Sequence, residues 1–219
     1  MTQSVKLVGI TRPTDEMMTT SDLIAYCARV SNPSNQDNKQ TAQKLIDYLI
    51  RNKHWSPLEM VSVVMEIETT RDIARQILRH RSFSFQEFSQ RYADPRELGF
   101  DYREARLQDQ TNRQNSIESD DDVLAISWAR QQAYVEQAAL TSYKWALDNG
   151  IAKEQARAVL PEGMMMSRMY MNGTLRSWLH YIELRIGNGT QKEHREIAAM
   201  ARDIIANEVP AVRDWLNEL

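Results

Sequence analysis

The sequence predicts an α+β fold, a single domain in which a small twisted sheet is packed by several helices. Three observations predict it. Segments with strand-like patterns are few and lie far apart in the chain, which does not fit a regular alternation of strands and crossover helices. A chain of 219 residues is long enough to bury one substantial core. Its apolar content of 42% and charged content of 26% are ordinary for a globular protein.

Two strands and three helices are predicted in the first 81 residues. Apolar side chains at Ala42, Ile46 and Leu49 recur with a helical period. Residues 60–69 are β-branched and roughly alternate, which is typical of a strand. In chain order the elements are a strand at 4–10, a helix at 21–31 capped by Ser21 or Thr20, a loop at 32–38, a helix at 39–52, a strand at 60–69 and a helix at 70–81.

Segment 94–122 is polar and rich in Gln, Asn, Asp and Arg, and apolar periodicity resumes after it. This indicates an excursion or lid within one domain that spans residues 1–219, not a linker. After it come a long helix at 122–149, a shorter helix at 152–159 that stops before Pro161, a strand at 163–172, a helix at 174–185 and a helix at 191–208.

Composition and charge exclude several classes of protein. The net charge of -3 and the pI of about 5.9 argue against a nucleic-acid binder. No apolar run approaches the roughly 18 residues of a membrane span, and the N-terminus lacks the basic start of a secretory signal. The single cysteine, Cys27, favours the reducing cytoplasm and is predicted to be a small buried hydrophobe.

Several residues outside the arginine clusters are predicted to have structural roles. No pair of the four histidines has a metal-binding spacing, so no metal site is predicted. His194 is predicted to be a solvated helix residue, and Gly163 and Gly173 are predicted to mark turns at the ends of a strand. The methionines of that region are predicted to fill the core: Met164, Met165, Met166, Met169 and Met171.

Residues 79–91, RHRSFSFQEFSQR, combine charge with aromatic side chains in a way that neither a solvated face nor a core segment needs. Arginine is suited to binding phosphate or carboxylate through two parallel hydrogen bonds. Adjacent basic groups at Arg79, His80 and Arg81 repel one another unless an anion lies between them. The stretch therefore predicts a site for a phosphorylated ligand, and the alternative is a salt-bridged surface at a helix end.

Neighbouring residues extend this site. A helix at 70–81 would place Arg71, Arg75 and Arg79 on one face. Ser89 supplies a hydroxyl, and Glu87 is an acceptor that could bind a ribose hydroxyl or a ring N–H.

Short motifs in a fixed order connect these residues to a family. Arg79-His80-Arg81 is followed by seven residues, Ser89, one residue and Arg91. The chain resembles the flavin-dependent thymidylate synthases in this signature. The resemblance extends to further segments: Ala28–Ser31, His54–Glu59, Ala74–Gln76, Ala156–Pro161, Gly173–His180 and Glu183–Arg185.

The resemblance implies an FAD-dependent reductive methylation of dUMP to dTMP, with 5,10-methylenetetrahydrofolate as carbon donor and NADPH as reductant. It implies a homotetramer with sites shared between subunits, and Arg185 as the catalytic residue that stabilises negative charge on the uracil ring. The dUMP residues would be Gln76, Arg79, Glu87, Ser89, Gln90, Arg91, Arg157 and Arg185. The FAD residues would be Ser56, Arg79, His80, Arg81, Glu87, Thr174, Arg176 and His180.

The spacing on the helix at 174–185 agrees with shared sites. Arg176 and His180 are i, i+4 neighbours, whereas Arg185 lies nine residues past Arg176, about two and a half turns, and points to nearly the opposite side. Two alternatives remain open: a non-catalytic sensor that binds nucleotide or flavin, and an RNA-binding protein, against which the acidic pI argues.

Overall fold

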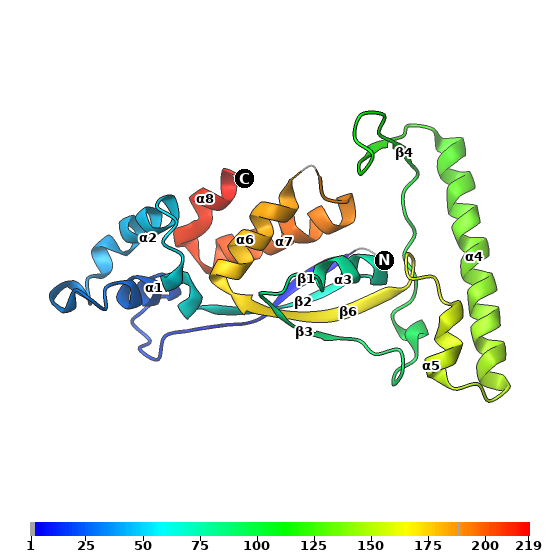
Figure 1. Ribbon diagram of the computed structural model, residues 1–219, viewed down its shortest axis with the longest axis horizontal. Coiled ribbons are helices and arrows are strands. Elements are labelled where there is room, and N and C mark those ends of the chain that lie inside the picture. Colours follow the sequence, from blue (N-terminus) through cyan, green and yellow to red (C-terminus); the bar gives the residue numbers. More distant parts are fainter. Residues whose placement is uncertain (1–2, 188) are drawn as a thin grey trace.

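Four antiparallel strands form the centre of the computed structural model, which describes residues 3–187 and 189–219 (Figure 1). The strand order is β1-β2-β6-β3, with β1 at Ser4–Ile10, β2 at Ser62–Thr70, β6 at Met166–Thr174 and β3 at Ser84–Glu87. Strand β6 therefore lies between two strands, β2 and β3, that precede it in the chain by roughly 100 and roughly 80 residues. The prediction of an α+β domain with a small sheet is confirmed.

One face of this sheet carries the core. The pairing of β2 with β6 places Met65 opposite Met171 and Ile67 opposite Met169, and all four side chains are fully buried. Helices α6 (Leu175–Ile186) and α7 (Lys192–Glu208) cover this face. The methionines predicted to fill the core are all buried, so this prediction is confirmed. Burying a side chain of this size stabilises the fold by roughly 1.5–3 kcal/mol.

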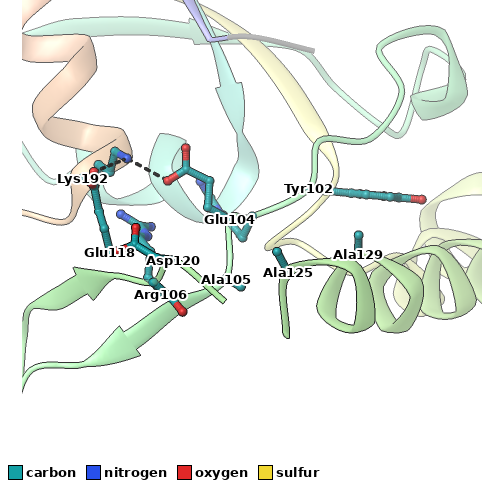
Figure 2. Close-up of a pocket in the computed structure, with 11 residues that line it drawn as sticks. Tyr102, Glu104, Ala105, Arg106, Glu118, Asp120, Ala125, Ala129 and Lys192 are labelled. Atoms are coloured by element: carbon teal, nitrogen blue, oxygen red, sulfur yellow. Dashed lines mark hydrogen bonds and ion pairs between the residues drawn. The ribbon is translucent and has the colours of Figure 1, made fainter. Parts of the chain in front are cut away.

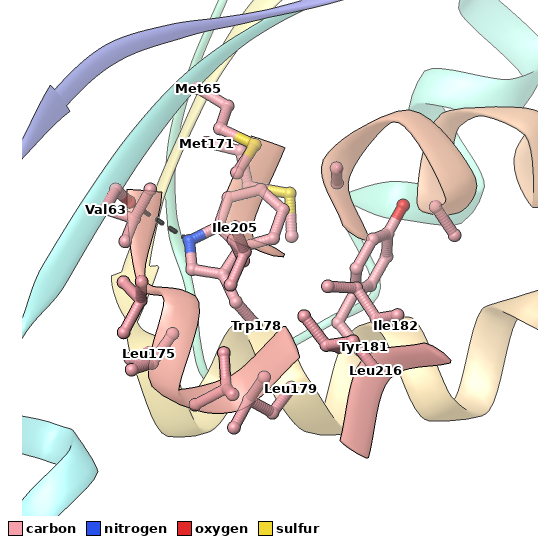
Figure 3. Packing of buried hydrophobic residues seen from close by; sticks show 14 of the residues in the cluster. Val63, Met65, Met171, Leu175, Trp178, Leu179, Tyr181, Ile182, Ile205 and Leu216 are labelled. Carbon is pink, nitrogen blue, oxygen red and sulfur yellow. Dashed lines mark hydrogen bonds between the residues drawn. The ribbon is translucent and has the colours of Figure 1, made fainter. Parts of the chain in front are cut away.

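Trp178 on α6 is the largest buried side chain of this core (Figure 3). Its indole N–H donates to the backbone carbonyl of Val63 over 3.1 Å, so the ring is buried without leaving its donor unpaired. This hydrogen bond connects α6 to β2, so the side of α6 that carries Trp178 faces the sheet and the polar side faces away from it.

The remaining helices are near their predicted positions, with different ends. Thr19 caps α1 through a capping box with Asp22, so the predicted cap at Ser21 or Thr20 is wrong by one or two residues. The bounds are α1 Thr20–Ala28, α2 Ala42–Arg51, α3 Arg71–Ile77, α4 Asp122–Asp148, α5 Lys153–Ala156 and α8 Arg213–Asn217, with 3-10 turns at Pro33–Asn35, Lys39–Thr41, Ser56–Met60, Pro95–Glu97, Arg157–Val159 and Pro210–Val212.

Helix α3 ends at Ile77, four residues before its predicted end. The backbone N–H of His80 donates to the carbonyl of Ile77 over 3.0 Å, which turns the chain so that β3 can return along β6. Periodicity could not show this end, because the pairing of β3 with β6 is a contact between distant residues.

Segment 94–122 runs beside α4 at one side of the molecule and contains a short hairpin, β4 (Arg106–Gln108) with β5 (Ser116–Glu118). Helix α4 buries few of its side chains against the rest of the chain: Gln132, Ala139, Tyr143 and Ala146. In the part of the chain that the structure describes, no helix combines the length and the apolar content that crossing a bilayer requires.

Gly173 lies inside β6, so the prediction that it marks a turn is wrong, whereas Gly163 does lie in a turn. A Cβ on Gly173 would lie 2.5 Å from Cε1 of Phe83, whose ring packs edge-on against Trp178 at 5.0 Å between centroids. Only a glycine leaves room for this ring.

Gly173→Ala is therefore expected to lower the free energy of unfolding by about 1–3 kcal/mol, because Phe83 must leave its packed position. Urea denaturation measures the effect. Gly163→Ala is the matched control, since a Cβ there meets nothing within 4 Å. An equal loss in both variants would contradict the packing role of Gly173.

Candidate functional site

A cleft of about 460 Å³ lies between the start of α3, the loop after β3 and the turn that follows α5. The backbone N–H of Arg71, the first residue of α3, donates to the carbonyl of Met165 over 2.9 Å and holds α3 against the start of β6. The lining residues are Arg71, Arg75, Gln90, Glu154, Arg157, Ala158, Leu160 and Glu162. Two of them, Gln90 and Arg157, are among the predicted dUMP residues.

Two carboxylates neutralise part of this basic cleft. Glu162 forms an ion pair with Arg75, and Glu154 lies 3.3 Å from the guanidinium of Arg91. The Nε of Arg157 donates to the backbone carbonyl of Glu154 over 3.3 Å. All four side chains of the two ion pairs are about half exposed, so their partners can be exchanged at low cost.

Gln90 is only 5% exposed, and its amide nitrogen is buried without a hydrogen-bond partner among the described residues. An unpaired buried donor costs roughly 1–3 kcal/mol. A donor of this kind in a basic cleft indicates that an acceptor-rich group binds there.

A second group of predicted residues surrounds His80. Arg185 donates from Nε to Nε2 of His80 over 2.9 Å. Burial, and then the charges of Arg185 and Arg79, lower the pKa of His80 to about 4. His80 is therefore a neutral acceptor at physiological pH, with its proton on Nδ1. Its ring packs edge-on against Tyr181, with 4.9 Å between centroids.

His194 belongs to this group, so its predicted solvated position is wrong. The side chain is fully buried, with Nε2 3.1 Å from the hydroxyl of Tyr181 and Nδ1 3.4 Å from Oε1 of Gln76. His194 begins a stripe of buried positions on α7 that continues at Ile197 and Ala198. This i, i+3, i+4 spacing was the sequence signal that could have found it.

Lowering the pH is expected to destabilise the protein through His194. Burial first, and then the charges of Arg185 and His80, lower the pKa of His194 from 6.5 to about 3. The unfolded chain thus binds a proton that the folded chain does not. The contribution of His194 to the free energy of unfolding is fully present above pH 6.5. It falls as the pH drops toward 3, by up to about 1.4 kcal/mol per pH unit.

Urea denaturation between pH 7 and 4 measures this loss. His194→Gln is expected to show a shallower pH dependence than the unchanged protein, and replacement of the exposed His54 serves as the control. Parallel curves for His194→Gln and the unchanged protein would contradict the role assigned to His194.

A third group of predicted residues lies at the opposite end of β6, about 27 Å from the cleft at the usual rise of a strand. Arg176 forms an ion pair with Glu59, and His180 packs edge-on against Trp55 at 4.6 Å between centroids. Ser56 begins the 3-10 turn that holds Glu59, and Thr174 caps α6 by accepting from the backbone N–H of Ser177 over 3.3 Å.

Other predicted residues lie on β3 and in the chain just before and after it. Glu87 accepts from the hydroxyl of Ser167 over 2.7 Å, and Ser89 accepts from the backbone N–H of Arg91 over 3.4 Å. Arg79 and Arg81 are exposed, and neither has an ion-pair partner in the described ranges 3–187 and 189–219. One chain thus brings the predicted residues into three groups and does not gather them into one pocket.

Helix α6 extends to Ile186, so Arg176 and Arg185 do lie on one continuous helix. Their partners differ: Glu59 for Arg176 and His80 for Arg185. The opposite orientation that the spacing predicts is confirmed.

Segment 94–122 is held to α3 and α7 by ion pairs that its composition did not reveal. Arg103 lies 2.9 Å from Asp72, Arg106 pairs with Glu193, and Lys192 lies 2.7 Å from Glu104. A cleft of about 490 Å³ opens beside these contacts (Figure 2). It contains none of the predicted site residues.

Cys27 is only partly buried, so the prediction of a buried hydrophobe is wrong in degree. Among the residues that the structure describes, no three His, Cys, Asp or Glu side chains lie close enough together to hold a metal ion.

Comparison with known proteins finds a matching family and similar proteins. Residues 14–211 match the family described as thymidylate synthase complementing protein. The probable flavin-dependent thymidylate synthase of Paramecium bursaria Chlorella virus 1 is 46% identical over 217 residues, covering 97% of this chain and 100% of the viral protein. The flavin-dependent thymidylate synthase of Synechocystis sp. is 47% identical over 212 residues, covering 95% and 96%.

A solved structure with a similar fold is the UMP/dUMP methylase PolB from Streptomyces cacaoi, bound with 5-Br dUMP. It superimposes with a TM-score of 0.83 at 25% sequence identity, covering 99% of this chain and 95% of that one.

Proposed function

The chain belongs to the flavin-dependent thymidylate synthase family, and from this premise we propose that it methylates dUMP to dTMP reductively. The proposal includes FAD as cofactor, 5,10-methylenetetrahydrofolate as carbon donor and NADPH as reductant. It also includes the cytoplasmic location predicted from the single cysteine. The observation that carries it is the basic cleft, where a buried amide donor without a partner lies beside three arginines.

In this proposal the cleft binds the phosphate of dUMP. Arg91 and Arg157 already lie beside Glu154, from which the phosphate would draw them. Gln90 would donate its unpaired amide, and Ser89 its hydroxyl. A guanidinium binds a phosphate through two parallel hydrogen bonds, so the exchange replaces half-exposed contacts with stronger ones.

Arg185 would act on the uracil ring. Its Nε donates to neutral His80, and the terminal nitrogens of the guanidinium would donate to a ring oxygen. A positive group held in this way stabilises negative charge that develops on the ring without reorganising during the reaction. Gln76, held by His194 and by Gln191 at 2.9 Å, would border the same base.

The group at the far end of β6 fits a flavin nucleotide. Arg176 and His180 are donors, His180 lies against the indole of Trp55, and Ser56 and Thr174 supply hydroxyls. These are the groups that bind a diphosphate and pack against an aromatic ring. Arg79, His80, Arg81 and Glu87 would complete the FAD contacts. The flavin supplies hydride transfer, and the chain positions the two rings.

We infer that the three groups meet between protomers of a homotetramer. The separation of about 27 Å along β6 keeps the cleft and the Arg176 group apart within one chain. The opposite directions of Arg176 and Arg185 on α6 support the same arrangement. Residues 1–219 form one domain in this proposal, and segment 94–122 acts as a lid anchored by Arg103 and Arg106.

Purified protein loaded with FAD tests the proposal. With dUMP present, NADPH is expected to bleach the flavin absorbance anaerobically, and addition of methylenetetrahydrofolate is expected to yield dTMP and to release tritium from C5 of labelled dUMP. A protein that binds flavin and dUMP but forms no dTMP would be a sensor. A protein that cannot be loaded with FAD would overturn the proposal.

A further inference from the structure

Arg71 is a largely buried arginine of the cleft, and the sequence assigns it no ligand. Its side chain is 12% exposed. The Nε and Nη1 atoms are buried and have no hydrogen-bond partner among the described residues. The nearest carboxylate is that of Glu87, 3.4 Å from Nη1. Gln90 contributes a third unpaired buried nitrogen to the same cleft.

The other charges of the cleft do not satisfy Arg71. Glu162 is paired with Arg75, and Glu154 lies beside Arg91. Glu87 already accepts a hydrogen bond from the hydroxyl of Ser167 over 2.7 Å. A guanidinium buried with unpaired donors is costly, and it persists where a ligand supplies the missing acceptors.

We propose that Arg71 is a further substrate-binding residue, which binds the phosphate monoester of dUMP together with Gln90. This inference rests on the proposed function. A phosphate monoester presents several acceptor oxygens and up to two negative charges, so it can accept from Nε and Nη1 of Arg71 and from Nε2 of Gln90. A neutral sugar or base offers too few acceptors and no charge to offset that of the guanidinium.

The pyrophosphate of FAD has the same chemistry, and the experiment separates the two sources. In FAD-loaded protein, Arg71→Met is expected to weaken dUMP binding about 10- to 100-fold by calorimetry, the range that a buried charge-assisted hydrogen bond gives. Binding of deoxyuridine, which lacks the phosphate, is expected to change less than about threefold on the same scale. The bound fraction of FAD, measured from its absorbance, is expected to stay unchanged.

Thermal unfolding distinguishes substrate binding from a structural role. Arg71→Met removes two buried nitrogens that lack hydrogen-bond partners, but it also removes the ion pair with Glu87, so the FAD-loaded variant without dUMP is expected to be about as stable as the unchanged protein. The rise in Tm that saturating dUMP causes is expected to shrink. Arg71→Lys restores the charge without the planar fork and is expected to recover part of the dUMP affinity. It also serves if Arg71→Met does not fold.

Arg202→Met is the matched control, since Arg202 lies on α7 beside Asp203 and outside the cleft. Unchanged dUMP affinity in both Arg71 variants, equal losses for dUMP and deoxyuridine, or loss of FAD instead of dUMP would each overturn the inference. The proposed function would survive these outcomes as long as the unchanged protein binds dUMP and forms dTMP. Failure of the unchanged protein to bind dUMP would remove both.

Discussion

Arg185→Ala is expected to reduce the rate of dTMP formation by at least about 10²–10³-fold while FAD stays bound. Loss of one preorganised donor to a developing anion has an effect of this size. Arg185 bonds to His80 and lies apart from the Arg176 group, so its removal leaves the proposed FAD contacts of that group in place. Steady-state rates and the flavin absorbance of the purified variant measure the two parts of the prediction.

The structure adds a spectroscopic result for the same variant. The charge of Arg185 is the second largest cause, after burial, of the low pKa of His80. Arg185→Ala is therefore expected to raise that pKa from about 4 toward its ordinary value of 6.5, observable in the NMR titration of the imidazole. Arg202→Ala, which removes an equal charge elsewhere, is the control. Full turnover in Arg185→Ala would contradict the catalytic role.

If the chain forms the homotetramer proposed above, charged substitutions on the outer face of α4 are expected to break up that assembly and to abolish activity. Val123, Tyr134 and Trp145 are 74%, 74% and 61% exposed. They are spaced eleven residues apart, about three helical turns, so they share one face. The side chains that α4 buries, such as Ala139 and Tyr143, lie on the other side. A long helix with an apolar stripe facing away from its own chain indicates an interface.

The variant Tyr134→Glu with Trp145→Glu tests this surface. Light scattering is expected to show a smaller species, because a desolvated carboxylate opposes association. The rate of dTMP formation is expected to fall with it, since the proposed sites are shared between protomers. Gln137→Glu adds a charge to an exposed polar position of the same helix and is the control. A variant that keeps the size and the activity of the unchanged protein would contradict the interface.

Local patterns were enough to predict most elements. The alternation in β2 and the helical period in α6 and α7 each follow from neighbours within a few residues. The ends of elements were less predictable, because capping by Thr19 and the early end of α3 depend on particular hydrogen bonds. The strand β3 was missed because its four residues pair only with β6.

The sequence by itself determined the α+β class, the residue types of the site and the family, since these depend on composition, on short-range spacing and on the order of motifs. The tertiary structure alone decided which of those residues meet. Arg185 reaches His80 across 105 residues of chain, and His194 reaches Gln76 across 118. Such contacts depend on the pairing of β2 with β6 and on the packing of α7 against the sheet. For the same reason, the unpaired nitrogens of Arg71 could be recognised only after the chain had folded around them.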